Sequence, residues 1–225
     1  MLRTNVLFIP FFLLALSLQA QDSSEKNFLI ELNFGRGVTG LHHTPADLYE
    51  TSGRNQEPEV QKSNFGNMFH ASVARRFGKR NYVGVMLGYT DYRYQEEGVV
   101  SDGMGGSEDY KLYHRFRFLD IGVFYKLLLY EKGRSRFFVE NELALQYDGE
   151  LHEEFNMFRL RFKNNYLFEG ANIRYRLGLK YAYLLTNWLQ LQGSAYYMTS
   201  INDYNTEARF EPYNLGLSLG VGVRW

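Results

Sequence analysis

The sequence has 225 residues, with 25 basic and 25 acidic side chains and no cysteine. A formal net charge of zero gives no field of one sign, which argues against a nucleic-acid partner. Without cysteine, these residues form no disulfide and carry no lipid-anchored thiol. The mean hydropathy is −0.37, yet 17% of the residues are aromatic. This polar average does not exclude a membrane protein, because strands that alternate apolar and polar residues produce it in either solvent.

Residues 1–20 are predicted to be a signal peptide. Arg3 supplies the positive start, Val6 to Leu18 form an apolar run, and Ala20 is a small residue before the cleavage point. An uncleaved anchor helix is the alternative, but the run is shorter than the roughly 20 residues that a helical span needs. We therefore expect residues 21–225 to be exported as one domain.

Beyond residue 26, apolar residues recur with period two and not with the spacing of an amphipathic helix. Phe28, Ile30 and Leu32, for example, alternate with Glu31 and Asn33. Eight stretches alternate in this way: 28–35, 69–74, 83–90, 119–127, 139–147, 173–183, 189–197 and 215–225. The sequence therefore predicts an all-β domain of eight strands.

The links between these strands alternate strictly in length. The short links are 78–81, 131–135 and 185–187, and the long links are 40–66, 95–112, 149–170 and 199–212. This alternation is typical of a transmembrane up-and-down antiparallel β-barrel with short periplasmic turns and long extracellular loops. The barrel must be closed, because an open edge leaves backbone groups unpaired in hydrocarbon. We predict an integral, porin-like protein of the cell outer membrane, with residues 21–225 as its barrel.

Two local features refine this prediction. The segment 155–163 also alternates, which predicts a strand extension above the membrane with a turn near Asn164-Asn165. Its exposed edge is suited to binding a partner by strand addition, but we favour the interpretation as an ordinary long hairpin. Asn141 falls on the lipid-facing side of its strand, where a polar group is costly, so we expect a β-bulge near it.

Aromatic residues gather near the strand ends, as in membrane barrels. The predicted girdles are Phe77, Tyr82, Tyr130, Phe137, Trp188 and Trp225 at the short turns, and Tyr89, Tyr92, Tyr147, Tyr197 and Tyr213 toward the long loops. The last strand resembles the signal that the outer-membrane assembly machinery recognises. The residues of this predicted assembly signal are Leu217, Leu219, Val221, Val223 and Trp225. Outer-membrane lipid and the assembly machinery are therefore expected partners.

The segment Arg117-Phe118-Leu119-Asp120-Ile121-Gly122-Val123-Phe124-Tyr125-Lys126 resembles a strand of the small outer-membrane β-barrel proteins of Bacteroidota, which include PorT-like proteins. In that family an aromatic-Leu-acid-Ile step is usually followed by proline and later by lysine. Gly122 stands here in place of the proline. The resemblance implies an eight-stranded barrel over nearly all of residues 21–225, and no particular activity. The PorT-like branch is linked to type IX secretion, a role that one short motif does not transfer.

Charged residues recur at the inward positions of the strands. We predict a lumen charge network of Glu31, Glu140, Glu142, Arg174, Arg176 and Lys180, with Asp120, Lys126 and Arg224 also facing inward. An open charged pore is one interpretation. The other is a filled structural core, because an eight-stranded barrel is just wide enough for side chains and unpaired buried charge is costly. We favour the filled core, in which strands 139–147 and 173–183 pair their charges.

Two constellations suggest chemistry. His70 and Ser72 face inward on one strand, as a base and a hydroxyl would in a deacylase-like enzyme that modifies lipid. His42, His43, His114 and His152 all fall near the loop end, where a metal site is the weaker alternative to solvated side chains. We expect no catalytic residue, no metal and no cofactor. The predicted function is display of loops to an envelope or extracellular protein partner, or support of envelope integrity, with a lipid-modifying enzyme and a small transport pore as alternatives.

Overall fold

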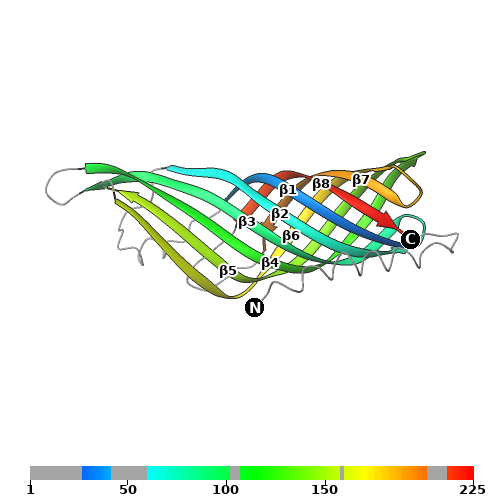
Figure 1. Ribbon diagram of the computed structural model, residues 1–225, viewed down its shortest axis with the longest axis horizontal. Coiled ribbons are helices and arrows are strands. Elements are labelled where there is room, and N and C mark those ends of the chain that lie inside the picture. The colour runs from blue at the N-terminus through cyan, green and yellow to red at the C-terminus, as the bar shows by residue number, and fades with distance from the viewer. Residues whose placement is uncertain (1–26, 42–59, 102–106, 158–159, 202–211) are drawn as a thin grey trace.

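The computed structural model describes residues 27–41, 60–101, 107–157, 160–201 and 212–225, which form eight antiparallel strands in one closed barrel (Figure 1). The strands are β1 (Phe28–Leu41), β2 (Val60–Phe77), β3 (Asn81–Ser101), β4 (Ser107–Lys132), β5 (Ser135–Met157), β6 (Leu160–Leu184), β7 (Leu189–Ser200) and β8 (Pro212–Arg224). Each strand pairs with the next, and β8 returns to β1. The predicted fold class is therefore confirmed. The predicted signal peptide, residues 1–20, lies outside the described residues.

The offset between neighbouring strands fixes the tilt of the barrel. Cross-strand partners followed from Ile30 through all eight strands return to β1 at Gly40, ten residues further along. Because of this offset the strands run obliquely to the long axis (Figure 1), and each row of partners climbs toward the loop end on its way from β1 to β8. An eight-stranded barrel of this kind has an interior that side chains can fill.

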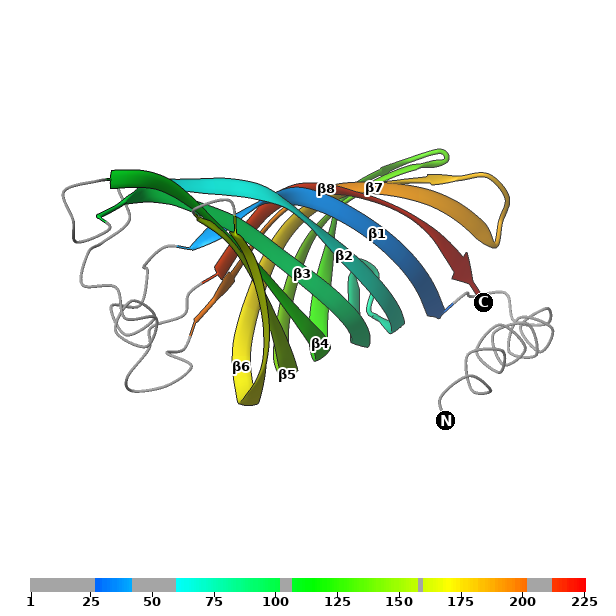
Figure 2. The same cartoon turned by 60° about the vertical axis from the view of Figure 1, so that its left-hand side comes forward.

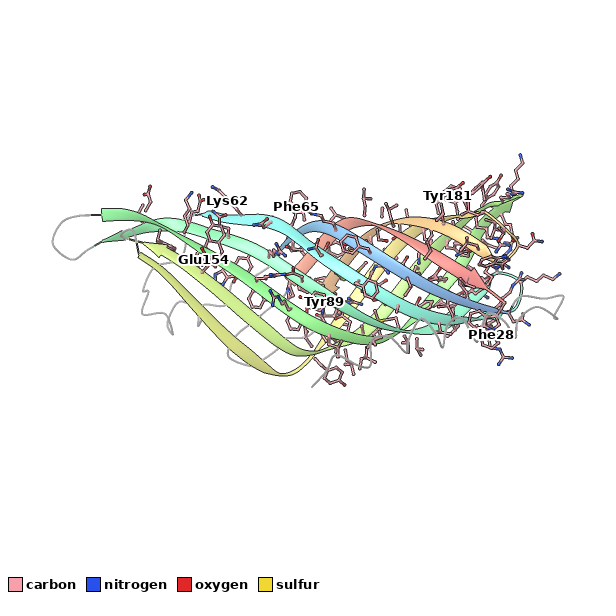
Figure 3. All side chains as sticks on the ribbon, in the orientation of Figure 1. Phe28, Lys62, Phe65, Tyr89, Glu154 and Tyr181 are labelled. Carbon is pink, nitrogen blue, oxygen red and sulfur yellow. The ribbon has the colours of Figure 1, made fainter. Side chains whose placement is uncertain are left out.

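The two faces of each strand differ in chemistry. On β8, Leu217 and Leu219 are 69% and 75% exposed, whereas Ser218 between them is buried. Phe28, Phe65 and Tyr181 likewise project from the outer surface (Figure 3). A continuous apolar exterior around a polar interior suits hydrocarbon and not water. In the part of the chain that the structure describes, no helix is long and apolar enough to cross a membrane.

The short links are tight turns at one end of the barrel, here called the turn rim; the opposite end is the loop rim. Gly78 between β2 and β3 and Gly133 between β4 and β5 have φ of 65° and 59°. These values lie in the left-handed region, which glycine enters without a Cβ penalty. Lys132 pairs with Ser135 across the second turn, which leaves a two-residue loop. The predicted turns at 78–81 and 131–135 are confirmed.

Two of the predicted long loops are largely strand. β3 and β4 extend to Ser101 and from Ser107, so most of 95–112 is a ladder, and β5 and β6 fill most of 149–170. Strands β3 to β6 therefore project beyond β1, β7 and β8 at the loop rim (Figures 1 and 2). The predicted extension is confirmed, but the turn near Asn164-Asn165 is wrong. These residues pair with β5, in a ladder that continues to Met157 and Leu160.

Asn141 needs no bulge. The register of β5 runs without a shift past Asn141 on both sides, so the predicted bulge is wrong. The Tyr175 hydroxyl donates instead to Asn141 Oδ1 at 2.7 Å. A hydrogen bond between two lipid-facing strands thus satisfies the amide oxygen where a change of register was expected.

Candidate functional site in the barrel lumen

The lower layer of the lumen, toward the turn rim, consists of two lysines and two glutamates from four strands. Lys126 on β4 contacts Glu31 on β1 and reaches Glu140 on β5 at 3.0 Å. Lys180 on β6 contacts the same two carboxylates at 3.3 and 2.8 Å. All four side chains are buried. Each ammonium therefore bridges both glutamates, and the layer is neutral.

The upper layer is built around Arg174. Its guanidinium donates to Asp120 Oδ2 at 2.6 Å and to Glu142. It also donates to the Thr90 hydroxyl at 3.0 Å and lies 3.3 Å from His70 Nε2. The side chain is fully buried. A planar guanidinium with five donors suits this arrangement, because it satisfies several acceptors at once.

Arg176 joins the two layers. It donates to Glu140 at 2.6 Å and to Glu142 at 3.1 Å, and its guanidinium lies 5.0 Å from the ring centroid of Tyr196. The lumen of the described barrel thus pairs four cations with four carboxylates. The structure brings together all six residues named for the lumen network. Asp120 and Lys126 join them, whereas Arg224 lies near the turn rim and forms no ion pair with this set in the described part of the chain.

Neutral polar side chains surround the ion pairs. Gln146 donates to Asp120 Oδ1 at 2.8 Å, and Asn172 donates to Gln146 at 3.3 Å. On the other side of the lumen, Gln192 donates to Asn33 at 2.7 Å. These amides satisfy acceptors that the cations leave over, as buried polar groups require.

Apolar clusters lie above and below the charges. The lower one comprises Leu29, Ala74, Tyr82, Met86, Phe124, Leu128, Phe138, Ala144 and Ala182. The upper one comprises Met68, Tyr92, Tyr94, Phe116, Phe118, Tyr196 and Met198. Tyr82 and Tyr92 were predicted in the lipid-facing girdles, which is wrong, because both are buried inside the barrel. Their even spacing from Met86, an inward position of the same strand, is the signal that identifies them.

The wall at β8 leaves room for these side chains. A Cβ atom at Gly216 would lie 2.7 Å from the Tyr196 hydroxyl, and one at Gly222 would lie 2.8 Å from the Gln190 side chain. A Cβ at Gly220 would meet Asn33. Larger residues from β1 and β7 thus occupy the space that the glycines leave, and the lumen is filled up to its wall.

The predicted catalytic pair is part of this packing. His70 lies 3.8 Å from Asp120 and 3.6 Å from Glu142, and the Ser72 hydroxyl lies 3.5 Å from Glu31. Among the described residues, no hydrogen bond joins His70 to Ser72, and both side chains are buried. For a metal, the described residues hold no group of three suitable ligands. His42 and His43 lie outside the described residues, and His114 is buried on β4.

The exterior changes from apolar to charged where β3 and β4 pass the apolar band. Asp91 accepts from Arg93 at 2.6 Å and from Arg115 at 2.9 Å. Further out, Lys62 hydrogen-bonds Glu97, and this contact lowers the pKa of the Glu97 carboxyl below its usual value. Charged side chains on the outward face indicate that the projecting strands are surrounded by water and not by lipid.

The residues predicted as an assembly signal lie on the outer face of β8 at its seam with β1. The Phe28 N–H donates to the Trp225 carbonyl at 2.9 Å, and the Trp225 N–H donates back at 3.1 Å. The two rings stack with centroids 5.7 Å apart. Leu217, Leu219 and Val221 face outward above them. Trp225 thus forms the last backbone pair between β8 and β1 at the turn rim.

The chain matches no family model, and its sequence matches no curated protein. Among solved structures it is similar to Neisserial surface protein A, with a TM-score of 0.47 and 16% identity over 88% of this chain and 97% of that one. The outer membrane protease OmpT from Escherichia coli gives 0.46 and 11% over 91% and 99%, and Ail, the attachment invasion locus protein of Yersinia pestis, gives 0.40 and 11% over 89% and 99%. These neighbours are outer-membrane proteins. Likeness at this level says nothing about activity, and the resemblance to Bacteroidota barrels stays a prediction.

Proposed function

We propose that this chain is an integral protein of the bacterial outer membrane that acts without catalysis, as a rigid barrel that displays its loop rim to a partner protein. One observation carries the proposal: a closed barrel with an apolar exterior encloses a filled lumen. In this lumen the charges are paired, and larger side chains occupy the space beside the glycines of β8. Such an interior makes the barrel stiff.

The projecting strands support the display function. β3 to β6 continue past the apolar band as paired ladders, and their outward faces carry charged residues such as Arg93, Arg115 and Lys111. Ladders that continue from a rigid barrel hold a surface in a fixed orientation outside the membrane. A partner protein or a surface polymer can bind there without entering the barrel.

The test is site-specific photo-cross-linking in whole cells. We expect a cross-linking residue at Glu154, on the projecting part of β5, to give one discrete adduct with a protein partner (Figure 3). The same residue at Lys79, in the turn between β2 and β3, is the matched control at the opposite rim. An adduct at Lys79 but none at Glu154 would contradict display at the loop rim.

A transport pore makes a different prediction. Because four cations and four carboxylates pair across the lumen, we expect the purified barrel to show no stable conductance in a planar bilayer. Single-channel recording against a known porin is the measurement. A stable, ion-selective conductance in the wild-type chain would overturn the filled lumen and favour the pore.

A further inference from the structure

A groove lies on the outer face of the barrel because β7 supplies two small residues between bulky neighbours. Gly193 pairs with Tyr181 on β6 and Leu219 on β8. Ala195, two residues on, pairs with Leu179 and Leu217 in the same way. The flanking leucines project further from the barrel than Gly193 and Ala195, which form the floor of the groove, and Leu179 is 63% exposed. The result is an apolar hollow of about 560 Å³.

The groove runs obliquely toward the turn rim. Its lining continues from Gly193 past Tyr181 to Phe137 and Leu129. Each row of partners climbs toward the loop rim from β1 to β8, so the same row descends in going from β8 back to β5. The groove therefore starts inside the apolar band and ends at the turn rim.

A polar hollow adjoins the lower end of the groove. Tyr130, Lys132 and Ser135 line it together with Phe137 and Tyr181, which also line the groove. The Ser135 and Tyr181 hydroxyls are 3.0 Å apart. The hollow thus offers one cation and three hydroxyls beside aromatic rings, at the depth where a membrane barrel meets the headgroups.

Lys132 is available to an external anion. It is exposed and has no ion-pair or hydrogen-bond partner in the described part of the chain. Glu131, the nearest acid in sequence, is held instead by Arg136, whose Nε donates to it at 2.7 Å. The hollow therefore carries an uncompensated positive charge.

We propose that this surface binds one anionic glycerophospholipid of the periplasmic leaflet, with its phosphate at Lys132 and an acyl chain in the groove over Gly193 and Ala195. The inference rests on the proposed membrane location. A phosphate accepts hydrogen bonds from an ammonium and from hydroxyls, and an acyl chain that lies in the groove gains van der Waals contacts with the side chains on both sides of it. A second copy of the chain fits less well, since a twofold contact would present Lys132 from both sides without a counter-charge.

Two variants separate the two halves of the site. Gly193→Leu fills the groove, and a Cβ there meets only ordinary contacts, with Leu219 Cδ2 at 3.5 Å and the Ser218 carbonyl at 3.6 Å. Lys132→Glu reverses the charge of the polar hollow. The matched controls are Ala71→Leu, at an outward position of β2, and Lys79→Glu, in the turn between β2 and β3.

The experiment adds dioleoyl phosphatidylglycerol to the delipidated full-length barrel in detergent and counts bound lipids by native mass spectrometry. We expect one retained lipid, at least tenfold weaker retention for both site variants, and wild-type retention for both controls. Unchanged retention in the site variants, or equal loss in the controls, would overturn the site. So would a dimer that Gly193→Leu abolishes, which would assign the groove to a second copy.

A difference in gel mobility between boiled and unboiled protein first shows that each chain is a folded barrel. A wild-type chain without this difference would contradict the membrane barrel and the lipid site together. A folded barrel that retains no phosphatidylglycerol would contradict the lipid site alone.

Discussion

Replacing Arg174 by methionine is expected to lower the free energy of unfolding by about 3 kcal/mol, at the lower end of the cost of breaking a buried ion pair. Arg174 is fully buried, and Asp120 and Glu142 both accept from it. Its loss leaves the Asp120 carboxylate with neutral donors alone, Thr90 and Gln146. The cost is not larger, because Arg176 still reaches Glu142.

Urea titration of the barrel in lipid vesicles, with the mobility of unboiled protein as readout, measures this change. Arg136→Met is the matched control, because Arg136 pairs with Glu131 at the turn rim, where an ion pair is worth about 0–1 kcal/mol. Adding Asp120→Asn to Arg174→Met should recover part of the loss, since the buried acceptor is then neutral. Equal losses for Arg174→Met and Arg136→Met would show that the lumen is hydrated and not filled.

The ion pairs specify which strands stand opposite one another inside the barrel. Paired buried charges are not more stabilising than a well-packed apolar core, so net stability is a weak reason for their presence. Glu31 on β1, however, meets Lys126 on β4 and Lys180 on β6 at the same level. A shift of one residue in any of these strands turns its charge outward into the apolar band. The network therefore penalises wrong registers, which is what a display scaffold of fixed shape requires.

Much of the barrel follows from the alternation of residues along the strands. Period two assigns each side chain to a face, and the same rule identifies Arg174 and Arg176 as inward residues near Glu140 and Glu142. It does not say which distant strands meet across the lumen. Contacts such as Glu31 with Lys180 depend on the offset of ten residues around the ring, which no single strand encodes.

The projecting strands show why 95–112 was predicted as a loop. Inside the membrane the outward residues are apolar, but beyond it Arg93, Glu97 and Lys111 face outward while Tyr94 and Leu112 face inward. The alternation persists, but its two faces exchange chemistry because the exterior solvent changes from lipid to water. A search for outward apolar residues therefore ends the strand too early. The alternation of inward and outward positions, followed without regard to their chemistry, extends the strand to its observed length.

Replacing Trp225 by alanine is expected to reduce insertion in cells by more than its effect on stability explains. In the folded barrel, Trp225 stacks on Phe28 and completes the β1–β8 seam through two backbone bonds that alanine keeps. Loss of the ring pair costs about 0.5–1.5 kcal/mol beyond the lost burial. A barrel whose lumen pairs four cations with four carboxylates tolerates such a loss once folded.

The control is Trp188→Ala, which removes the other tryptophan of the turn rim, an exposed residue in the link between β6 and β7. If the assembly machinery reads the aromatic after β8, Trp225→Ala should deplete the inserted, heat-modifiable form in cells, while Trp188→Ala and Trp225→Phe should not. All three purified chains should refold into detergent to similar extents. Equal depletion by Trp225→Ala and Trp188→Ala would assign Trp225 to the girdle alone. A refolding defect of Trp225→Ala as large as its defect in cells would mean that closure of the seam, and not recognition, is what the tryptophan supplies.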